Sequence, residues 1–259
     1  MATRRQFCDA MIEVYKNHGV YIGTGNGELT EKLTIGKIRQ MEVNYGYDTA
    51  KTNTNIRRDL AYIGKCYEKG WDMSKSRAGD CSGIIVGVMR DLEIIKPTSD
   101  YSAKMFQKAS TKVALKDIKP GDLVFNKTSD ASHVGTCTAI ENGLPIIIES
   151  KGRDEGVVRR SVSEGSWVVG GRLDGWFDDD VIVLTRILKY VPENMMRGED
   201  VRQVQEQLQL AGYTPGTADG VFGKKTKIAV QAFQLDNGLE ADGIVGKNTA
   251  TALGFKWEG

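Results

Sequence analysis

Apolar residues near the N-terminus recur at the spacing of an amphipathic helix. Over residues 4–17 they fall on one helical face, which contains Phe7, Met11, Val14 and Tyr15. His18 and Gly19 follow, and this pair is typical of a helix end, because Gly19 suits the left-handed position and a histidine cation favours the helix dipole. We therefore expect a helix here and a structural role for His18. A second helix is expected over residues 56–70.

A further helical face follows an aspartate and a cysteine. Its apolar positions are Ile84, Ile85, Val88, Met89 and Leu92. Asp80 is a favourable N-cap, which places Cys81 in the first turn of this helix, on the same inward side as Ile85. A helix N-terminus stabilises an anion and so favours the thiolate form of Cys81. From this segment alone, a structural cysteine and a nucleophile are equally consistent with the pattern.

Residues 21–27 contain three glycines but no phosphate-binding motif. No strand precedes them and no Gly-Lys-Ser/Thr follows. The segment therefore favours a flexible loop.

Alternating segments later in the chain predict an antiparallel hairpin over residues 132–140 and 144–150, after a strand at 123–125. His133 shares its face with Gly135 and Cys137, because side chains alternate along a strand. A five-residue loop over 139–143 would place His133 opposite Glu149. A two-residue Asn142-Gly143 turn, the stronger local signal, would instead pair Glu149 with Thr136 on the other face. The pattern leaves both registers open.

The C-terminal part contains an internal repeat. Residues 218–230 resemble residues 241–253, and each copy consists of an Asp-Gly turn that leads into a helix. An apolar helix over residues 200–211, ended by Gly212, precedes them. These elements predict a compact three-helix unit, in which the core face of the second helix is Ile228, Ala229, Ala232 and Phe233. We expect domains at 1–189 and 199–259, joined by a linker at 190–198.

The composition excludes several classes of protein. The chain has 259 residues, 40% hydrophobic and 27% charged, which is typical of a globular protein. Its net charge of +1 gives no case for nucleic-acid binding. No apolar run reaches the ~18–20 residues that span a bilayer, and the first residues lack the apolar stretch of a secretory leader. The four cysteines form no CxxC pair and the two histidines argue against a zinc site, so we expect no metal and no other cofactor.

The C-terminal pattern resembles the peptidoglycan-binding domain type 1 family. The resemblance lies mainly in Asp219-Gly220, Phe222-Gly223, Thr226, Asp242-Gly243 and Thr249. It implies a three-helix module that holds cell-wall enzymes on peptidoglycan. Tyr213, Asp219 and Phe222 are the candidate wall-binding residues.

Three motifs in the first part resemble the NlpC/P60 cysteine peptidase family. In chain order they are Asp80-Cys81-Ser82-Gly83, Pro120-Gly121-Asp122-Leu123-Val124-Phe125 and His133-Val134-Gly135. The resemblance covers roughly residues 5–180. It implies a papain-like α+β fold, in which helices pack on an antiparallel sheet and the cysteine helix faces the histidine strand. Glu149 stands where many members have histidine or asparagine.

The resemblance also implies the roles of the site residues. Cys81 is the expected nucleophile, His133 the base and Glu149 the residue that orients the histidine. Tyr21, Asp80 and Ser82 are expected beside the substrate, with the backbone N–H of Cys81 at the oxyanion.

The implied function is that of a phage-type endolysin that cuts the stem peptides of peptidoglycan. The expected bond joins D-γ-glutamate to the diamino acid. The alternatives are an N-acetylmuramoyl-L-alanine amidase with the same site and a non-catalytic wall-binding or phage structural protein. We expect a monomer whose partner is peptidoglycan, without nucleic acid or membrane. It would be made in the host cytoplasm and would reach the wall after release by a holin.

Overall fold

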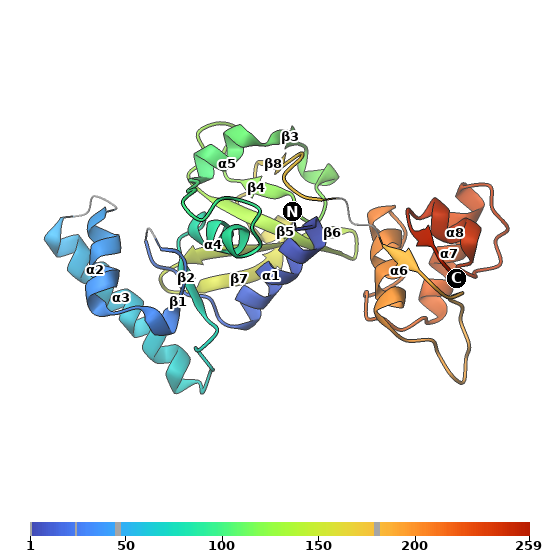
Figure 1. Ribbon diagram of the computed structural model, residues 1–259, viewed down its shortest axis with the longest axis horizontal. Coiled ribbons are helices and arrows are strands. Elements are labelled where there is room, and N and C mark those ends of the chain that lie inside the picture. The colour runs from blue at the N-terminus through green and yellow to red at the C-terminus, as the bar shows by residue number, and fades with distance from the viewer. Residues whose placement is uncertain (1, 24, 45–47, 179–181) are drawn as a thin grey trace. The chain divides into compact units, whose positions relative to one another are not determined.

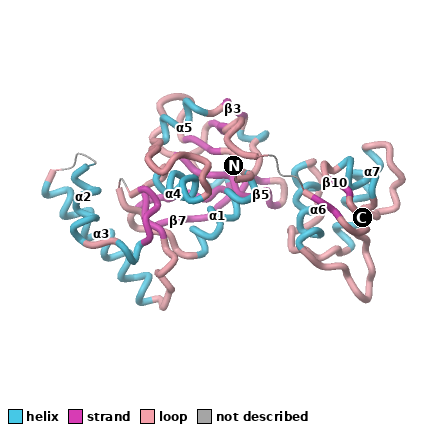
Figure 2. Tube along the Cα trace, viewed as in Figure 1, coloured by secondary structure: helices cyan, strands magenta, loops and turns pink. Residues whose placement is uncertain are grey.

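The structure is a computed structural model that describes residues 2–23, 25–44, 48–178 and 182–259 (Figure 1). The chain splits into two compact units. The first comprises Met1–Ala139 and Pro145–Asp179, and the second comprises Asp180–Gly259 together with Ile140–Leu144. Helices and strands occur in both units (Figure 2), and the expected α+β class is confirmed. No helix among the described residues has the length and apolar character needed to cross a membrane.

The first unit is built on a six-stranded sheet of order β3-β8-β4-β5-β6-β7. The strands are β3 (Thr111–Val113), β4 (Leu123–Phe125), β5 (Val134–Glu141), β6 (Leu144–Gly152), β7 (Gly156–Ser161) and β8 (Val169–Arg172). Helices α1 (Arg4–Lys16) and α4 (Gly83–Asp91) pack on this sheet, and α5 (Ala103–Ala109) also contributes to its core. The core includes Phe7, Ile85, Phe106, Leu123 and Ile148, so it joins all three helices to the central strands.

Helix α4 also crosses a second, two-stranded sheet at unusually short range. This sheet pairs β1 (Asn26–Leu29) with β2 (Arg77–Gly79). A Cβ atom on Gly87 would lie 2.6 Å from Cα of Gly27, and one on Gly83 would lie 1.7 Å from the carbonyl oxygen of Gly25. The expected flexible loop is therefore wrong for Gly25–Gly27, which are held between helix and strand. Thr24, in the same segment, lies outside the described residues.

Helix α1 forms as predicted, but its last turn differs from the prediction. The left-handed residue is His18, with φ 55°, and not Gly19. The imidazole of His18 stacks on Trp71 with 3.6 Å between ring centroids. Burial and the nearby Lys69 lower the pKa of His18, so its neutral form is favoured over the cation expected at a helix end.

Two helices that project from the first unit form a hairpin (Figure 1), α2 (Ile35–Asn44) and α3 (Thr49–Glu68). The predicted helix at 56–70 is the second half of α3, which begins earlier because the Asp48 side chain accepts a hydrogen bond from the backbone of Lys51. The sequence pattern did not predict α2. Its Glu42 and Asp59 of α3 are fully buried, where both contact the guanidinium of Arg153, at 2.7 and 2.6 Å.

The second unit contains the three predicted helices, α6 (Glu199–Leu210), α7 (Lys224–Asp236) and α8 (Lys247–Ala252). The internal repeat has a physical basis in two glutamines. The amide of Gln205 donates to Asp219, Val221 and Thr226, and the amide of Gln234 donates to Asp242, Ile244 and Thr249. Each glutamine thus fastens one Asp-Gly turn to the helix that follows it.

Two predictions for this unit need correction. Ile228 of α7 is 64% exposed and Ala232 is also exposed, so the core face of this helix contains Ala229, Val230 and Phe233 instead. Residues 182–198 belong to this unit, because β9 (Val183–Leu184) pairs in parallel with β10 (Lys256–Trp257) and Leu188 lies in the same core. The boundary between the two units follows Asp179. It therefore comes earlier in the chain than the predicted end of the first domain at 189 and than the predicted linker at 190–198.

The close contact between α4 and β1 predicts opposite effects for two helical glycine substitutions. Gly87→Ala forces backbone apart and is expected to destabilise the fold by roughly 1–3 kcal/mol or more. Gly64→Ala, in the interior of α3 with open space around it, is expected to stabilise by about 0.5–1 kcal/mol. Urea unfolding of both variants beside the wild type measures the two changes. Equal effects of the same sign would contradict the close packing.

Candidate active site

Cys81 lies in the short turn between β2 and α4, and the Asp80 side chain shapes this turn. Oδ1 of Asp80 accepts hydrogen bonds from the backbone N–H of Ser82 at 3.0 Å and of Gly83 at 2.7 Å. Asp80 therefore accepts from the backbone at the start of the helix, as an N-cap side chain does, although the residue at the N-cap position of α4 is Ser82. Cys81 stands two residues before Gly83, where α4 begins, rather than inside its first turn. The Ser82 hydroxyl also donates to Asp80, so both Ser82 donors serve the turn.

His133 directly precedes β5 and meets both Cys81 and Glu149. Its Nε2 lies 2.5 Å from Oε2 of Glu149, and its ring interacts with the Cys81 side chain. Because Glu149 engages Nε2, Nδ1 is the ring nitrogen available to Cys81. The backbone N–H of His133 donates to the side chain of Asn126 at 3.1 Å. The indole of Trp167 stacks parallel to the imidazole, with 5.4 Å between centroids.

The hairpin that joins His133 to Glu149 combines the two registers left open by the sequence. Its turn consists of two residues, Asn142 and Gly143, with φ angles of 52° and 76°. A regular ladder from this turn would pair Glu149 with Thr136 and turn it away from His133. Gly135, however, faces the side chain of Ile147, and Glu149 reaches His133. The hairpin therefore contains an odd register shift, such as a β-bulge provides.

Glu149 is a buried carboxylate with two cationic partners. It is 2% exposed, and its Oε1 accepts from Nε of Arg160 at 2.6 Å while Oε2 faces His133. Burial alone would raise the pKa of Glu149, but the hydrogen bonds and charges of His133 and Arg160 outweigh burial and hold the pKa below its ordinary value. Glu149 is thus kept ionised inside the protein.

The ionisation of His133 follows from the same contacts. Burial lowers the pKa of His133, but the hydrogen bonds and charges of Cys81 and Glu149 outweigh burial and raise it to about 9. A group with a raised pKa keeps its proton until the pH approaches that value. At neutral pH the resting site therefore favours an imidazolium at His133, next to the sulfur of Cys81.

Arg160 and Trp167 complete the site, and the sequence analysis missed both. Arg160 stands on β7 beside Arg159, and only the strand register decides which arginine faces Glu149. Trp167 is placed by Gly165, where a Cβ atom would lie 2.1 Å from the indole Nε1. A glycine two residues before a tryptophan is a weak signal, and it could not have indicated stacking on His133.

Tyr21 lies on the segment that runs beside β2, where the backbone N–H of Ile22 donates to the carbonyl of Gly79. Its ring is 5.4 Å from the guanidinium carbon of Arg153. The expected roles of Tyr21, Asp80 and Ser82 toward substrate stay predictions, although the turn already uses the Ser82 donors.

The candidate wall-binding residues of the second unit have structural partners. Phe222 is fully buried, so its side chain belongs to the core and cannot contact a polymer. This prediction is corrected. Asp219 accepts from Gln205 and from the backbone of Val221 within its own turn. The Tyr213 hydroxyl donates to Asp236 at 2.9 Å.

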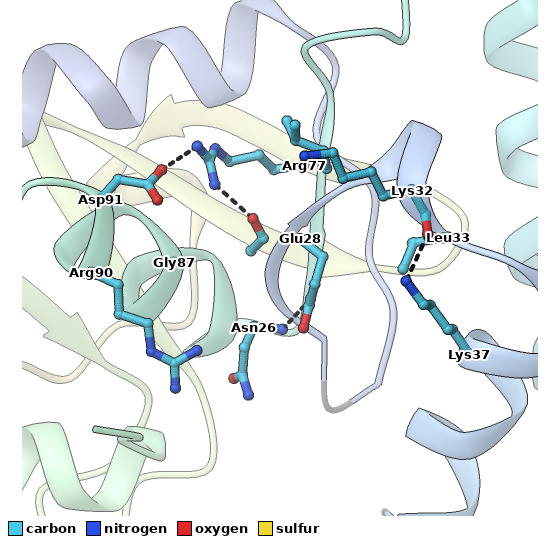
Figure 3. A pocket seen from close by; sticks show the side chains of 11 residues that line it. Asn26, Glu28, Lys32, Leu33, Lys37, Arg77, Gly87, Arg90 and Asp91 are labelled. Carbon is cyan, nitrogen blue, oxygen red and sulfur yellow. Dashed lines mark hydrogen bonds and ion pairs between the residues drawn. The ribbon is translucent and has the colours of Figure 1, made fainter. Parts of the chain in front are cut away.

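A separate hollow lies over β1 and the second half of α4 (Figure 3). Four cations, Lys32, Lys37, Arg77 and Arg90, line it together with Glu28 and Asp91. Arg77 donates to the carbonyl of Gly27 at 2.7 Å and pairs with Asp91, which ties β2 to β1 and α4. Cys81, His133 and Glu149 do not line this hollow.

Comparison with known proteins finds matches to both units. Residues 64–169 match the NlpC/P60 family model, and residues 197–253 match the peptidoglycan binding domain model. A spore cortex-lytic enzyme of Oceanobacillus iheyensis is 45% identical over 56 residues, which are 22% of this chain and 20% of that protein. The N-acetylmuramoyl-L-alanine amidase CwlL of Bacillus licheniformis is 42% identical over 69 residues, 24% of this chain and 19% of that protein. The chain thus spans about a fifth of the length of these relatives.

Among solved structures, the P60 domain of the antigen MAP1204 from M. avium subspecies paratuberculosis aligns with 66% of this chain and 96% of its own. The TM-score is 0.38 and the identity 16%. The two family matches contain the motifs on which the resemblance rests, Cys81 and His133 in the first and the Asp-Gly repeat in the second. Residues 64–169 therefore form a domain of the NlpC/P60 family of cysteine peptidases, and residues 197–253 form a domain of the peptidoglycan-binding family.

Proposed function

We propose that this protein is a peptidoglycan hydrolase that cleaves an amide bond of the stem peptide through Cys81. The observation that carries the proposal is the continuous chain of contacts from Cys81 through His133 and Glu149 to Arg160. A thiol beside an imidazolium, with a buried carboxylate on the far ring nitrogen, is the arrangement that activates a cysteine nucleophile. The peptidoglycan-binding domain supports the choice of polymer.

In the proposed reaction, the Cys81 thiolate attacks the carbonyl carbon of the amide. The tetrahedral intermediate places its negative oxygen next to the backbone N–H of Cys81. His133 then gives its proton to the departing amine, and a thioester forms on Cys81. A water molecule, deprotonated by His133, hydrolyses the thioester and regenerates the thiolate–imidazolium pair.

Glu149 and Arg160 act on this cycle through His133. Glu149 fixes Nε2 of the ring and favours the imidazolium form, which must be present when the amine leaves. Arg160 keeps Glu149 ionised at 2% exposure, where an unpaired carboxylate would take up a proton. Trp167 lies parallel to the ring of His133 and helps to hold its plane.

The bond that we propose joins D-γ-glutamate to the diamino acid, as the resemblance to the NlpC/P60 family implies. The endolysin role and release by a holin rest on the same resemblance. The name of the Bacillus licheniformis relative is that of an amidase, but this chain covers only 19% of that protein.

A product analysis with Cys81→Ala tests the proposal. We expect the wild type to release soluble fragments from purified peptidoglycan and the variant to release none, because the variant has no nucleophile. Mass spectrometry of the fragments identifies the bond. New N-termini at the diamino acid indicate the endopeptidase, whereas stem peptides that begin with L-alanine indicate an amidase with the same site. Equal products from enzyme and variant would refute the nucleophile.

The pH dependence of Glu149→Gln tests the role of the buried carboxylate. In the wild type, activity should fall as the pH rises through about 9, where His133 loses its proton. Removing the negative charge while burial persists lowers the pKa of His133, so this alkaline limb moves to lower pH. The rate should fall by roughly 10²–10⁴-fold.

The proton itself can be followed by NMR. The chain has two histidines, His18 and His133. The imidazole signal that remains in a His18→Asn variant is therefore that of His133. An alkaline limb and a His133 titration that both stay at the wild-type pH in Glu149→Gln would contradict the role of Glu149.

A further inference from the structure

The helical hairpin of the first unit presents almost only positive charge. Between residues 32 and 69 the chain has eight lysines and arginines and four aspartates and glutamates. All eight cations are exposed: Lys32, Lys37, Arg39, Lys51, Arg57, Arg58, Lys65 and Lys69. Of the four acids, Glu42 and Asp59 are fully buried, so within this range only Asp48 and Glu68 reach the surface, and the exposed Glu31 directly precedes the range.

Glu42 and Asp59 do not reach the surface because they are buried against Arg153. This arginine, on the turn between β6 and β7, inserts under the hairpin and binds both buried carboxylates. Asn55 also donates to Glu42, at 2.7 Å. Arg153 offsets one of the two negative charges, and burial raises the pKa of Asp59 to about 7. Both acids are inside the protein, so neither carboxylate lies among the lysines and arginines on the surface. Among the outer cations Arg58 pairs with Asp154, and Arg39 donates to the side chain of Asn53.

The positive surface continues into the hollow over β1. Lys32 and Lys37, at the start of the hairpin, line the hollow together with Arg77 and Arg90 (Figure 3). Two acids, Glu28 and Asp91, also line it, and Asp91 pairs with Arg77, so cations exceed acids there by two. The hollow and the exposed faces of α2 and α3 therefore form one surface, which we call the basic hairpin surface. The chain as a whole has a net charge of only +1, so this concentration of cations is local.

We propose that the basic hairpin surface binds the carboxylates of peptidoglycan stem peptides and holds the polymer beside the catalytic unit. The proposal rests on the proposed function, because it takes peptidoglycan as the substrate. Stem peptides present free carboxylates at close intervals along a polymer, and exposed lysines and arginines attract such a polyanion without a shaped pocket. The surface would act apart from the peptidoglycan-binding domain, which belongs to the other unit.

Because the proposed binding of peptidoglycan to the basic hairpin surface is electrostatic, its affinity should depend strongly on the salt concentration. Exposed charges interact over about 10 Å at 0.1 M ionic strength and over about 3 Å at 1 M. Binding through the hairpin should therefore weaken steeply with added salt. Neutralising the carboxylates of the polymer should have the same effect as salt.

The test compares two triple variants of the full chain, each made in a Cys81→Ala background so that the polymer stays intact. The first is Lys32→Gln/Lys37→Gln/Lys65→Gln on the basic hairpin surface. The matched control is Lys108→Gln/Lys112→Gln/Lys116→Gln, three exposed lysines around α5 and β3. Sedimentation with purified peptidoglycan between 20 and 300 mM salt measures binding. The same polymer with its carboxylates converted to neutral amides provides the second probe.

We expect the hairpin variant to bind about five-fold more weakly at low salt, as three lost exposed ion pairs imply, and the control to stay within two-fold. The amidated polymer should abolish the difference, and Lys→Arg replacements at the hairpin positions should restore binding. Equal losses in both triple variants, or an undiminished difference on amidated polymer, would overturn the proposal. Binding to anionic phospholipid vesicles instead of peptidoglycan would assign the surface to a membrane and also overturn it.

A separate readout distinguishes this proposal from the proposed function. With Cys81 intact, release of fragments from peptidoglycan reports catalysis. A wild type that shows no salt-sensitive binding to peptidoglycan but still releases fragments would refute the hairpin surface alone. Salt-sensitive binding without any Cys81-dependent fragments would refute the proposed hydrolase instead.

Discussion

The active site depends on a contact between two backbones that leaves no room for side chains. Helix α4 crosses β1 at Gly27 and Gly87, and the start of the helix touches the carbonyl of Gly25. This contact fixes the distance between α4 and the β1–β2 sheet. It thereby fixes the position of the turn that carries Cys81. The hydroxyl of Ser150 adds a second tie, because it donates to the carbonyl of Gly79 at 2.8 Å. Ser150 adjoins Glu149, so the cysteine turn and the acidic strand are held to each other.

A second constraint is the balance of charge behind His133. A carboxylate that is 2% exposed costs free energy unless it has partners. Glu149 has two, and the same pairing that keeps it ionised also raises the pKa of His133. Arg160, Glu149 and His133 therefore form one electrostatic unit, whose positive end meets the sulfur of Cys81. The resemblance to the NlpC/P60 family implies histidine or asparagine at this position in many members, whereas this chain has the carboxylate of Glu149, with Arg160 as its counterion.

Local pattern was sufficient for most of the helices, whereas among the strands it predicted β4, β5 and β6 alone. The apolar periodicity identified α1, α4 and α6, and the Asp-Gly repeat located the turns that Gln205 and Gln234 hold. It was insufficient where distant residues decide the outcome. Helix α2 has little apolar pattern because its buried Glu42 is neutralised by Arg153, 111 residues away in the chain.

In the candidate site, too, local motifs predicted some residues, whereas contacts between distant residues decided the others. Cys81 and His133 stand in recognisable motifs, whereas their meeting with Glu149 depends on a register shift inside a hairpin whose turn signal indicated the opposite face. Arg160 could not be told from Arg159 without that register. Trp167 had no sequence signal that linked it to His133. Contacts across strands are therefore the part of the site that sequence alone leaves undetermined.

The parallel pairing of β9 with β10 has a consequence for how the second unit is joined to other domains. Lys256 lies opposite Val183, so the first and last strands of this unit are neighbours. A domain whose two ends lie close together can be inserted into a loop of another protein without forcing the two ends of that loop apart. It can also be fused to a neighbouring domain at either end. The pairing also needs both Leu184 and Trp257, so this unit cannot complete its fold before its last strand has been synthesised.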